Sequence, residues 1–365
     1  MRVLIVGAGA SKEAGYPLAS NLMTAIGTEM TQSSVNDRTA WDAWDQYRRS
    51  ISGHLGAILD CPNPEVTLSL LDLYEQALKA NDDEWLEARL RQARDTGTAE
   101  PYDGHYESAD REELEKGTVA RNRLVDCLHS YFAFKHWSDA QDRRPREYLA
   151  ALLAQLAPND VVITFNWDTT VERSLAEAGR WSPFAGYGFE KGLLLRSPYD
   201  DPLPLPIGLP TESEVSVLKL HGSFGWHHTT EGDVYFDHRY YLCHFGFEWN
   251  GQPLQLIDPR ARSLGPPVDF AFAYPTFLKQ LRGKDMQTIW HRAAMALAEA
   301  STVEVWGYSL PASDLGARVL LNGLRSRLDA RTVEVNVHVA DDVEAERRWR
   351  EFLGNSAGID RKKLQ

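Results

Sequence analysis

One stretch near the amino terminus decides the fold: Val3-Leu4-Ile5-Val6-Gly7-Ala8-Gly9-Ala10-Ser11, with Gly15 and Pro17 close behind. Its first four residues form an apolar, largely β-branched run, which is typical of a strand buried on both faces. The small residues that follow allow the backbone to approach a ligand closely, and N–H groups at a strand-to-helix turn favour a pyrophosphate. The stretch therefore predicts a dinucleotide site at the carboxyl end of a parallel strand.

The glycine spacing departs from the common nucleotide-binding fingerprints. Lys12 stands where the Gly-x-Gly-x-x-Gly pattern has its last glycine, and no Gly-Lys-Ser/Thr sequence follows. No second strand ending in an acidic residue appears about twenty residues on, so the usual ribose clamp of hydride-transfer enzymes is missing. A tight turn without a ligand stays an alternative for these glycines.

Further runs of β-branched residues predict the rest of the sheet. Three of them, Val161–Phe165, Val215–Leu220 and Val303–Trp306, end in polar or glycine-bearing residues and indicate buried parallel strands with active loops at their carboxyl ends. A fourth, Val333–Val339, alternates valine with polar residues, which indicates a strand nearer the sheet edge. The expected fold is an α/β, Rossmann-like parallel sheet with helices on both faces and a large helical insertion.

The insertion is expected over residues 31–150, between a Rossmann-like domain formed by residues 1–30 and 151–355. Aromatic and aliphatic residues recur there at helical spacing, and they are Trp41, Trp44, Tyr47, Val125, Leu128 and Phe132. Residues 81–116 hold twelve acidic against five basic residues, and the part around Asp95–Asp110 predicts an exposed loop or hairpin. Ser197–Thr211, with five prolines, predicts a loop packed over the sheet.

Composition excludes several classes of protein. The 365 residues carry a net charge of −13, which makes a nucleic-acid partner unlikely because phosphate binding is built from clustered Lys and Arg. Cys61, Cys127 and Cys243 stand far apart and fit neither a disulfide framework nor a zinc ribbon. The apolar runs are too short for a signal peptide or a membrane helix. We therefore expect a cytoplasmic protein with no membrane partner.

Four strand-end segments, in this order, resemble the sirtuin-like NAD-binding superfamily. They are the Gly7–Ser11 stretch with Gly15-Tyr16-Pro17, Thr164-Phe165-Asn166-Trp167-Asp168, Lys219-Leu220-His221-Gly222-Ser223, and Gly307-Tyr308-Ser309-Leu310-Pro311 with Asp314. The match covers motif positions across roughly residues 1–320, whereas the helical insertion matches nothing specific. The resemblance implies NAD⁺ as the bound molecule and substrate. It implies NAD contacts from Gly7, Ala8, Gly9, Ala10, Ser11, Gly15, Pro17, Thr164, Asp168, Gly222, Ser223, Gly307, Tyr308, Ser309 and Asp314.

Two departures separate the chain from protein deacylases. Leu-Ala-Ser follows Pro17 where a deacylase carries Phe-Arg, and the four-cysteine zinc module is absent. The sequence is instead similar to the sirtuin-like NAD hydrolases (NADases) of bacterial antiviral defence, which deplete NAD⁺. That resemblance implies a homo-oligomer and a separately encoded ATPase or sensor protein as partner.

Two residues are the candidate catalytic groups. Asn166, after a buried strand, offers an amide that could hold the ribose hydroxyls or orient water; closing a strand-to-helix turn is its alternative role. His221, after the Val215–Leu220 run, has an imidazole suited to general-base catalysis, and its alternative role is that of a packed side chain.

For the remaining polar groups the sequence allows both ligand-binding and structural roles. The Gly307–Asp314 loop is placed beside the adenosine half, although Asp314 is equally suited to cap a helix beginning near Leu315. Thr169 and Glu172 fit a capping box. A local cluster fits no standard zinc spacing, so no metal is expected, and its members are His227, His228, His238, Cys243 and His244.

Two other functions stay open from sequence alone. One is a protein ADP-ribosyl transferase or deacylase; the other is a catalytically silent NAD-binding module that regulates a partner. If the helical insertion covers the carboxyl edge of the sheet, it could also restrict access to NAD⁺ until a partner or an oligomer rearranges it.

Overall fold

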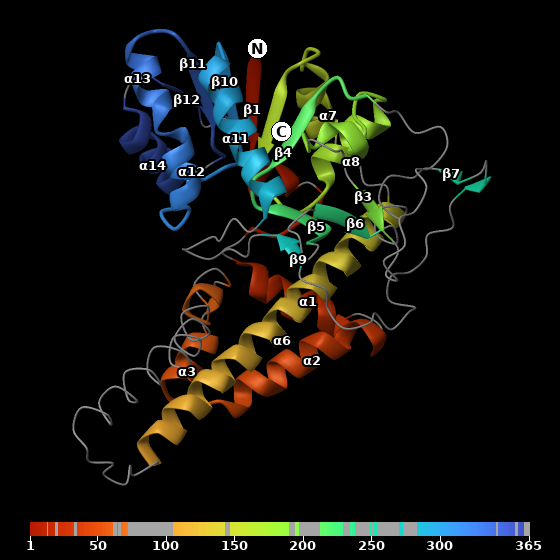
Figure 1. Cartoon of the computed structure of the whole chain (residues 1–365), viewed down its shortest axis with the longest axis vertical. Helices are drawn as coiled ribbons and strands as arrows, with labels where there is room; N and C mark the ends of the chain where they lie inside the picture. Colours follow the sequence, from red (N-terminus) through yellow and green to blue (C-terminus); the bar gives the residue numbers. More distant parts are fainter. Residues whose placement is uncertain are drawn as a thin grey trace, which may run out of the picture. The chain divides into compact units, whose positions relative to one another are not determined.

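A computed structural model gives the fold of the chain (Figure 1). The residues that it describes are 1–12, 14–18, 21–32, 35–60, 64, 67–71, 105–142, 147–189, 194–196, 212–228, 234–237, 248–249, 252–253, 270–272, 283–340, 342–354 and 357–360. The chain divides into two compact units. The first, here called the sheet unit, comprises Met1–Leu18, Phe132–Tyr274 and Lys279–Gln365, and the helical unit comprises Ala19–Tyr131 and Pro275–Leu278.

A six-stranded, all-parallel sheet forms the centre of the sheet unit, in the order β12-β11-β10-β1-β2-β4. Its strands are β1 (Arg2–Val6), β2 (Val161–Thr164), β4 (Ser216–Lys219), β10 (Thr302–Trp306), β11 (Glu334–His338) and β12 (Gly358–Asp360). Figure 1 shows β1, in red, between the blue strands β10 to β12 and the green strand β4. The order of the strands reverses between β1 and β10, and ligands of open α/β sheets bind beside such a switch point.

The predicted strands exist because their side chains are buried on both faces. Val3, Leu4, Ile5 and Val6 are wholly buried, as are Val162 and Ile163 of β2. Continuous burial of this kind requires layers on both faces of the sheet, as in other Rossmann-like α/β folds. The helices of this unit are α7 (Glu147–Ala154), α8 (Thr170–Glu177), α9 (Pro183–Gly186), α11 (Lys284–Glu299), α12 (Leu315–Leu321), α13 (Gly323–Asp329) and α14 (Val343–Leu353).

A second, four-stranded sheet in the same unit is absent from the sequence prediction. Its order is β3-β6-β5-β9, with β3 (Leu194–Arg196), β5 (Gly222–His228), β6 (Val234–Asp237) and β9 (Phe270–Phe272). A separate two-stranded ladder joins β7 (Glu248–Trp249) to β8 (Gln252–Pro253). Because only two residues separate β4 from β5, the chain passes from one sheet to the other through a tight corner at Leu220 and His221.

The helical unit confirms the helical spacing read from the sequence. It contains α1 (Leu22–Gln32), α2 (Val35–Ser50), α3 (Gly53–Leu59) and most of α6 (His105–Asp142), whose last residues belong to the sheet unit. Leu22, Ile26 and Met30 form the buried face of α1, and Trp44 of α2 is also buried. Apolar residues that recur every three or four positions lie on the same face of a helix.

One sequence expectation is corrected in part. The tract around Asp95–Asp110 was expected to form an exposed loop or hairpin, but its last six residues belong to α6, which begins at His105 and whose long continuation supports them as helix; residues 95–104 lie outside the described residues. Residues 333–339 were expected nearer the sheet edge, and this is confirmed, because β11 is the second strand from the edge, next to β12. Ser197–Thr211 lies outside the described residues. Among the described helices, none combines the length and the apolar character needed to cross a membrane.

Candidate functional site

The predicted motifs meet at the carboxyl edge of the main sheet. In parallel strands all carboxyl ends share one edge, so the residues that follow β1, β2, β4 and β10 become neighbours although they are far apart in the sequence. Backbone hydrogen bonds continue the sheet beyond the strands, from Phe165 N to Val6 O and from Leu220 N to Thr164 O. The segments that carry Asn166 and His221 are therefore held against adjacent strands.

Asn166 is joined directly to the first glycine segment. Its Nδ2 donates to Oγ of Ser11 over 3.0 Å, and both side chains are buried. The backbone N–H of Asn166 donates to Oγ1 of Thr164, which fixes the turn after β2. Among the described residues, the amide oxygen Oδ1 of Asn166 accepts no hydrogen bond. These two hydrogen bonds therefore fix the orientation of the amide.

His221 occupies the corner between the two sheets. Gly222 has φ of 74°, a left-handed conformation that lets the chain turn sharply from β4 into β5. Leu220 is held from two sides, since its N–H donates to Thr164 O and its carbonyl accepts from Nε1 of Trp290 over 2.8 Å. The imidazole therefore projects from a backbone that is fixed on both sides of the corner.

A carboxylate from a distant segment contacts the imidazole. Nε2 of His221 lies 3.3 Å from Oδ2 of Asp314, and the same oxygen accepts a hydrogen bond of 2.7 Å from the hydroxyl of Tyr308. Oδ1 of Asp314 accepts from the backbone of Ala317, so Asp314 also caps α12. The contact with Asp314 orients the imidazole through Nε2.

Phe165 is the site residue that sequence reasoning missed. Its ring stacks on Tyr308, with centroids 4.3 Å apart, and packs at a tilt against His221, with centroids 5.0 Å apart. It therefore links the segments after β2, β4 and β10. Its position between Thr164 and Asn166 in the motif was the available signal, because a residue at the end of a buried strand faces its neighbours in the sheet.

The glycine turn after β1 packs directly on the turn after β10. A Cβ at Gly7 would lie 2.5 Å from Cα of Tyr308, and one at Gly307 would lie 2.4 Å from N of Ala10. The backbone N–H groups of Gly7, Gly9 and Ala10 donate to the carbonyls of Trp306, Gly307 and Gly7. These three amides are therefore bonded within the protein.

The element after this turn differs from expectation. Ala8–Ser11 forms a four-residue 3₁₀ helix, and the first α-helix among the described residues begins at Leu22, so the turn does not lead directly into an α-helix N-terminus. Gly15 and Pro17 lie just beyond it. Gly15 has φ of 82°, and its N–H donates to Lys12 O, which identifies it as part of a closed turn.

A buried ion pair supports the segment that carries Asn166. Nζ of Lys219 lies 2.8 Å from Oε1 of Glu172 and donates to the backbone carbonyl of Asp168 over 2.5 Å, and both charged side chains are wholly buried. The hydroxyl of Tyr187 donates to the same oxygen of Glu172. Burial raises the pKa of Glu172, and the charge of Lys219 offsets part of that increase.

This pairing corrects the predicted capping box. Thr169 is the N-cap residue of α8, as expected, but its side chain makes no capping hydrogen bond. Oδ1 of Asp168 accepts from the backbone N–H of Thr170 instead. Glu172 cannot serve the N-cap because the stronger, charge-assisted interaction with Lys219 draws it into the core.

Several predicted NAD contacts also have structural partners within the chain. Ser223 donates to the carbonyl of Trp167, and the carbonyl of Ser309 accepts from Nε of Arg348. Among the described residues no group of three His, Cys, Asp or Glu side chains is arranged to hold a metal ion. In the predicted His/Cys cluster, residues 238, 243 and 244 and the side chains of 227 and 228 lie outside the described parts.

The described residues therefore form one buried polar cluster, here called the rim cluster. It consists of Ser11, Asn166, His221, Tyr308 and Asp314, with Phe165 between the last three and the Asn166 segment. The cluster offers an oriented amide and an imidazole paired with a carboxylate, which are the groups needed to orient water and accept its proton.

Neither the models of protein families nor the curated protein sequences give a match to this chain.

Proposed function

We propose that this chain is an NAD⁺ hydrolase that cleaves the nicotinamide–ribose bond and releases nicotinamide and ADP-ribose. The observation that supports this proposal most strongly is the rim cluster, in which the Ser11–Asn166 hydrogen bond and the His221–Asp314 contact join residues that follow four different strands. A polar cluster of this kind beside the switch point of a parallel sheet is the usual place for a nucleotide and its chemistry.

The demands of the reaction match the groups in the cluster. Nicotinamide leaves as a neutral molecule from a cationic pyridinium, so a strong acid is unnecessary; the enzyme must stabilise a ribose cation and position water. Oδ1 of Asn166 would accept a hydrogen bond from a ribose hydroxyl or from that water. His221 would take the proton of the water, while Asp314 would orient the ring and stabilise the imidazolium.

Other groups receive supporting roles in this proposal. The backbone around Gly7, Gly9 and Gly307 would shape the wall of the site, since their close packing excludes side chains. Phe165 and Tyr308 would hold the imidazole of His221 in position against the carboxylate of Asp314. On the sequence resemblance alone, we further propose a cytoplasmic antiviral-defence effector that forms a homo-oligomer and works with a separately encoded ATPase or sensor protein.

Product analysis tests the reaction. The full chain is incubated with NAD⁺ alone, with an acylated peptide, and with a protein acceptor, and nicotinamide, ADP-ribose and modified acceptor are quantified by chromatography and mass spectrometry. Equal amounts of nicotinamide and free ADP-ribose in all three mixtures are expected. ADP-ribose attached to the acceptor, or deacylated peptide, would replace hydrolysis by group transfer. Unchanged NAD⁺ at all concentrations of the chain would contradict the proposal in favour of a binding module.

A further inference from the structure

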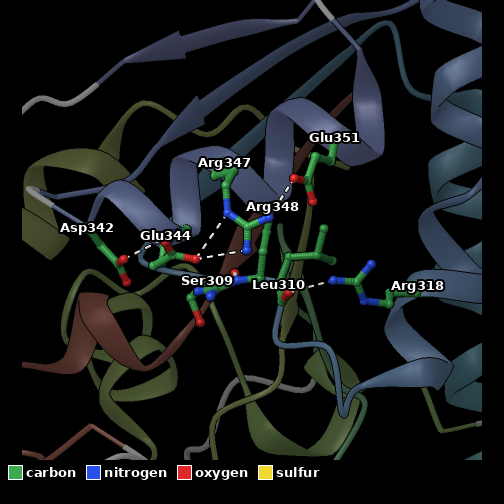
Figure 2. Close-up of polar contacts among 9 residues, drawn as sticks. Ser309, Leu310, Arg318, Asp342, Glu344, Arg347, Arg348 and Glu351 are labelled. Carbon is green, nitrogen blue, oxygen red and sulfur yellow. Dashed lines mark hydrogen bonds and ion pairs between the residues drawn. The ribbon is translucent and has the colours of Figure 1, made fainter.

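The loop after β10 is held by an unusual set of side-chain donors. Nε1 of Trp349 donates to the carbonyl of Tyr308, and Nε of Arg348 donates to that of Ser309, each over 2.8 Å. Arg318 donates to the next two carbonyls, those of Leu310 and Pro311, over 3.1 and 3.3 Å. Figure 2 shows Arg348 reaching Ser309 from α14 and Arg318 reaching Leu310 from α12. Four consecutive carbonyls are thus each bonded to a side chain.

The conformation of this loop explains why such support is needed. Leu310 has φ of 49° and Gly307 has φ of 64°, and a left-handed conformation at a leucine is strained. Strain of this kind persists only where surrounding contacts fix the backbone. Hydrogen bonds from a charged guanidinium to a carbonyl are stronger than those between neutral groups. Arg348 and Arg318 are therefore well suited to hold this backbone in place.

The loop leads directly to the rim cluster. Tyr308 at its start and Asp314 just after its end are bonded to each other, and Asp314 contacts Nε2 of His221. A shift of the backbone at Ser309 would therefore move both groups that orient the imidazole. Misplacement of a catalytic group by about 1 Å can cost roughly 100-fold in rate.

We infer that Arg348 is a positioning residue, which sets the geometry of the His221–Asp314 pair from helix α14 without touching the substrate. This inference rests on the proposed NAD⁺ hydrolysis for its kinetic test, but not for its structural one. Arg348 is the most useful of the donors to examine: it is half-buried, whereas Trp349 is wholly buried in the core and its removal would disturb folding.

The neighbouring arginine provides a matched control. Arg347 lies on the same helix and pairs only with that helix's own residues in Figure 2, through Glu344 at 2.9 Å and Glu351 at 2.5 Å. Its side chain is 55% exposed. Removing it changes the charge of α14 by the same amount as removing Arg348, but leaves the carbonyl of Ser309 bonded.

The kinetic test compares Arg348→Ala, Arg348→Lys and Arg347→Ala in the full chain, after thermal melting has shown that each is folded. Arg348→Ala should lower kcat for nicotinamide release roughly 10-fold to 100-fold with KM nearly unchanged. Arg348→Lys, which keeps a charged donor, should recover most of the loss, and Arg347→Ala should match the wild type. A parallel loss in both alanine variants, or a rise in KM alone, would overturn the inference.

A spectroscopic test needs no activity. In chains labelled with ¹⁵N-histidine, the ring resonances of His221 are assigned by their disappearance in His221→Gln and compared at a fixed pH. They should shift in Arg348→Ala and stay in place in Arg347→Ala. If the wild type leaves NAD⁺ intact and these shifts still occur, the proposed function fails while the positioning role of Arg348 stands. Unshifted His221 resonances in folded Arg348→Ala would contradict that role.

Discussion

The two halves of the sheet's carboxyl edge are held in different ways. Between β1 and β10, backbone packs on backbone: Gly7 and Gly9 lie against Gly307 and Tyr308, and main-chain hydrogen bonds join the two turns. Between β2 and β4, a side chain reinforces the backbone hydrogen bond from Leu220 N to Thr164 O, since buried Lys219 reaches the carbonyl of Asp168 and pairs with Glu172.

The difference shows how one sheet edge can combine two features: backbone turns that approach each other closely, and charged side chains held in a defined geometry. Backbone packing brings the turns nearer than any side chain allows, and it depends on glycine rather than on charge. The ion pair requires two desolvated charges that are stable only together. Each half should therefore respond to a different kind of substitution.

The largest effect is expected from removing one partner of the buried ion pair. Lys219→Met leaves Glu172 buried without its cation, and Glu172→Gln leaves Lys219 without its anion, so each should lower the free energy of unfolding by about 3–5 kcal/mol. Urea denaturation measures this. The double variant Lys219→Met/Glu172→Gln should lose less than the sum of the two single losses; additive losses would mean that the pair is not coupled.

Glycine substitution should come next and act on the other half of the edge. At Gly307 a methyl group meets both a left-handed φ and the backbone of Ala10, so Gly307→Ala should cost roughly 3 kcal/mol. Gly179 has nearly the same φ, 68°, but open space around it, so Gly179→Ala should cost only about 1 kcal/mol. Equal losses in thermal melts would show that conformation, rather than close packing, dominates.

The pH dependence of stability should identify Glu172 directly. Because burial raises its pKa above the ordinary 4.5, its contribution to stability is present below pH 4.5 and is lost as the pH rises through the folded-state value. Lys219→Met removes the interaction that limits this rise, so its deficit relative to wild type should grow with pH, by at most about 1.4 kcal/mol per pH unit. The double variant lacks the Glu172 carboxyl and its titration, so its deficit relative to wild type should shrink as the pH rises through the folded-state pKa of Glu172.

The smallest effect is expected where the two halves meet. Ser11→Ala removes the acceptor of Nδ2 of Asn166 and should lower the free energy of unfolding by about 1 kcal/mol. Because Asn166 would then lose its orientation, nicotinamide release should fall more than the loss of stability alone would cause. Ser11→Thr, which keeps a hydroxyl, is the matched variant; if both variants keep the wild-type rate, the Ser11–Asn166 bond has no role in turnover.

Much of the central sheet can be predicted from the sequence because buried parallel strands require unbroken apolar runs. Val3–Val6 and the runs beginning at Val161, Val215 and Val303 all match strands, and they place Asn166 and His221 at the same sheet edge. A search for apolar, β-branched runs does not find the second sheet. Its strand β5, for example, contains glycine, histidine and aromatic residues instead of β-branched ones.

Pairings inside the site could not be read from local sequence. Glu172, in α8, has a spacing that suits a capping box, but it pairs instead with Lys219 at the end of β4, and only tertiary structure brings those two together. Asp314 has the position of a helix cap and does cap α12, but its contact with His221 depends on how β4 and β10 are placed in the sheet. Local patterns therefore identified the residues, while the fold decided their partners.

Nicotinamide release from NAD⁺ by the wild type, Asn166→Ala and His221→Ala chains tests the central claim most directly. If the amide and the imidazole serve one reaction, each variant should keep its circular dichroism spectrum and lose at least about 100-fold in kcat/KM. The double variant should then be little slower than either single one. Wild-type turnover in both folded single variants would show that the rim cluster is not where the chemistry takes place.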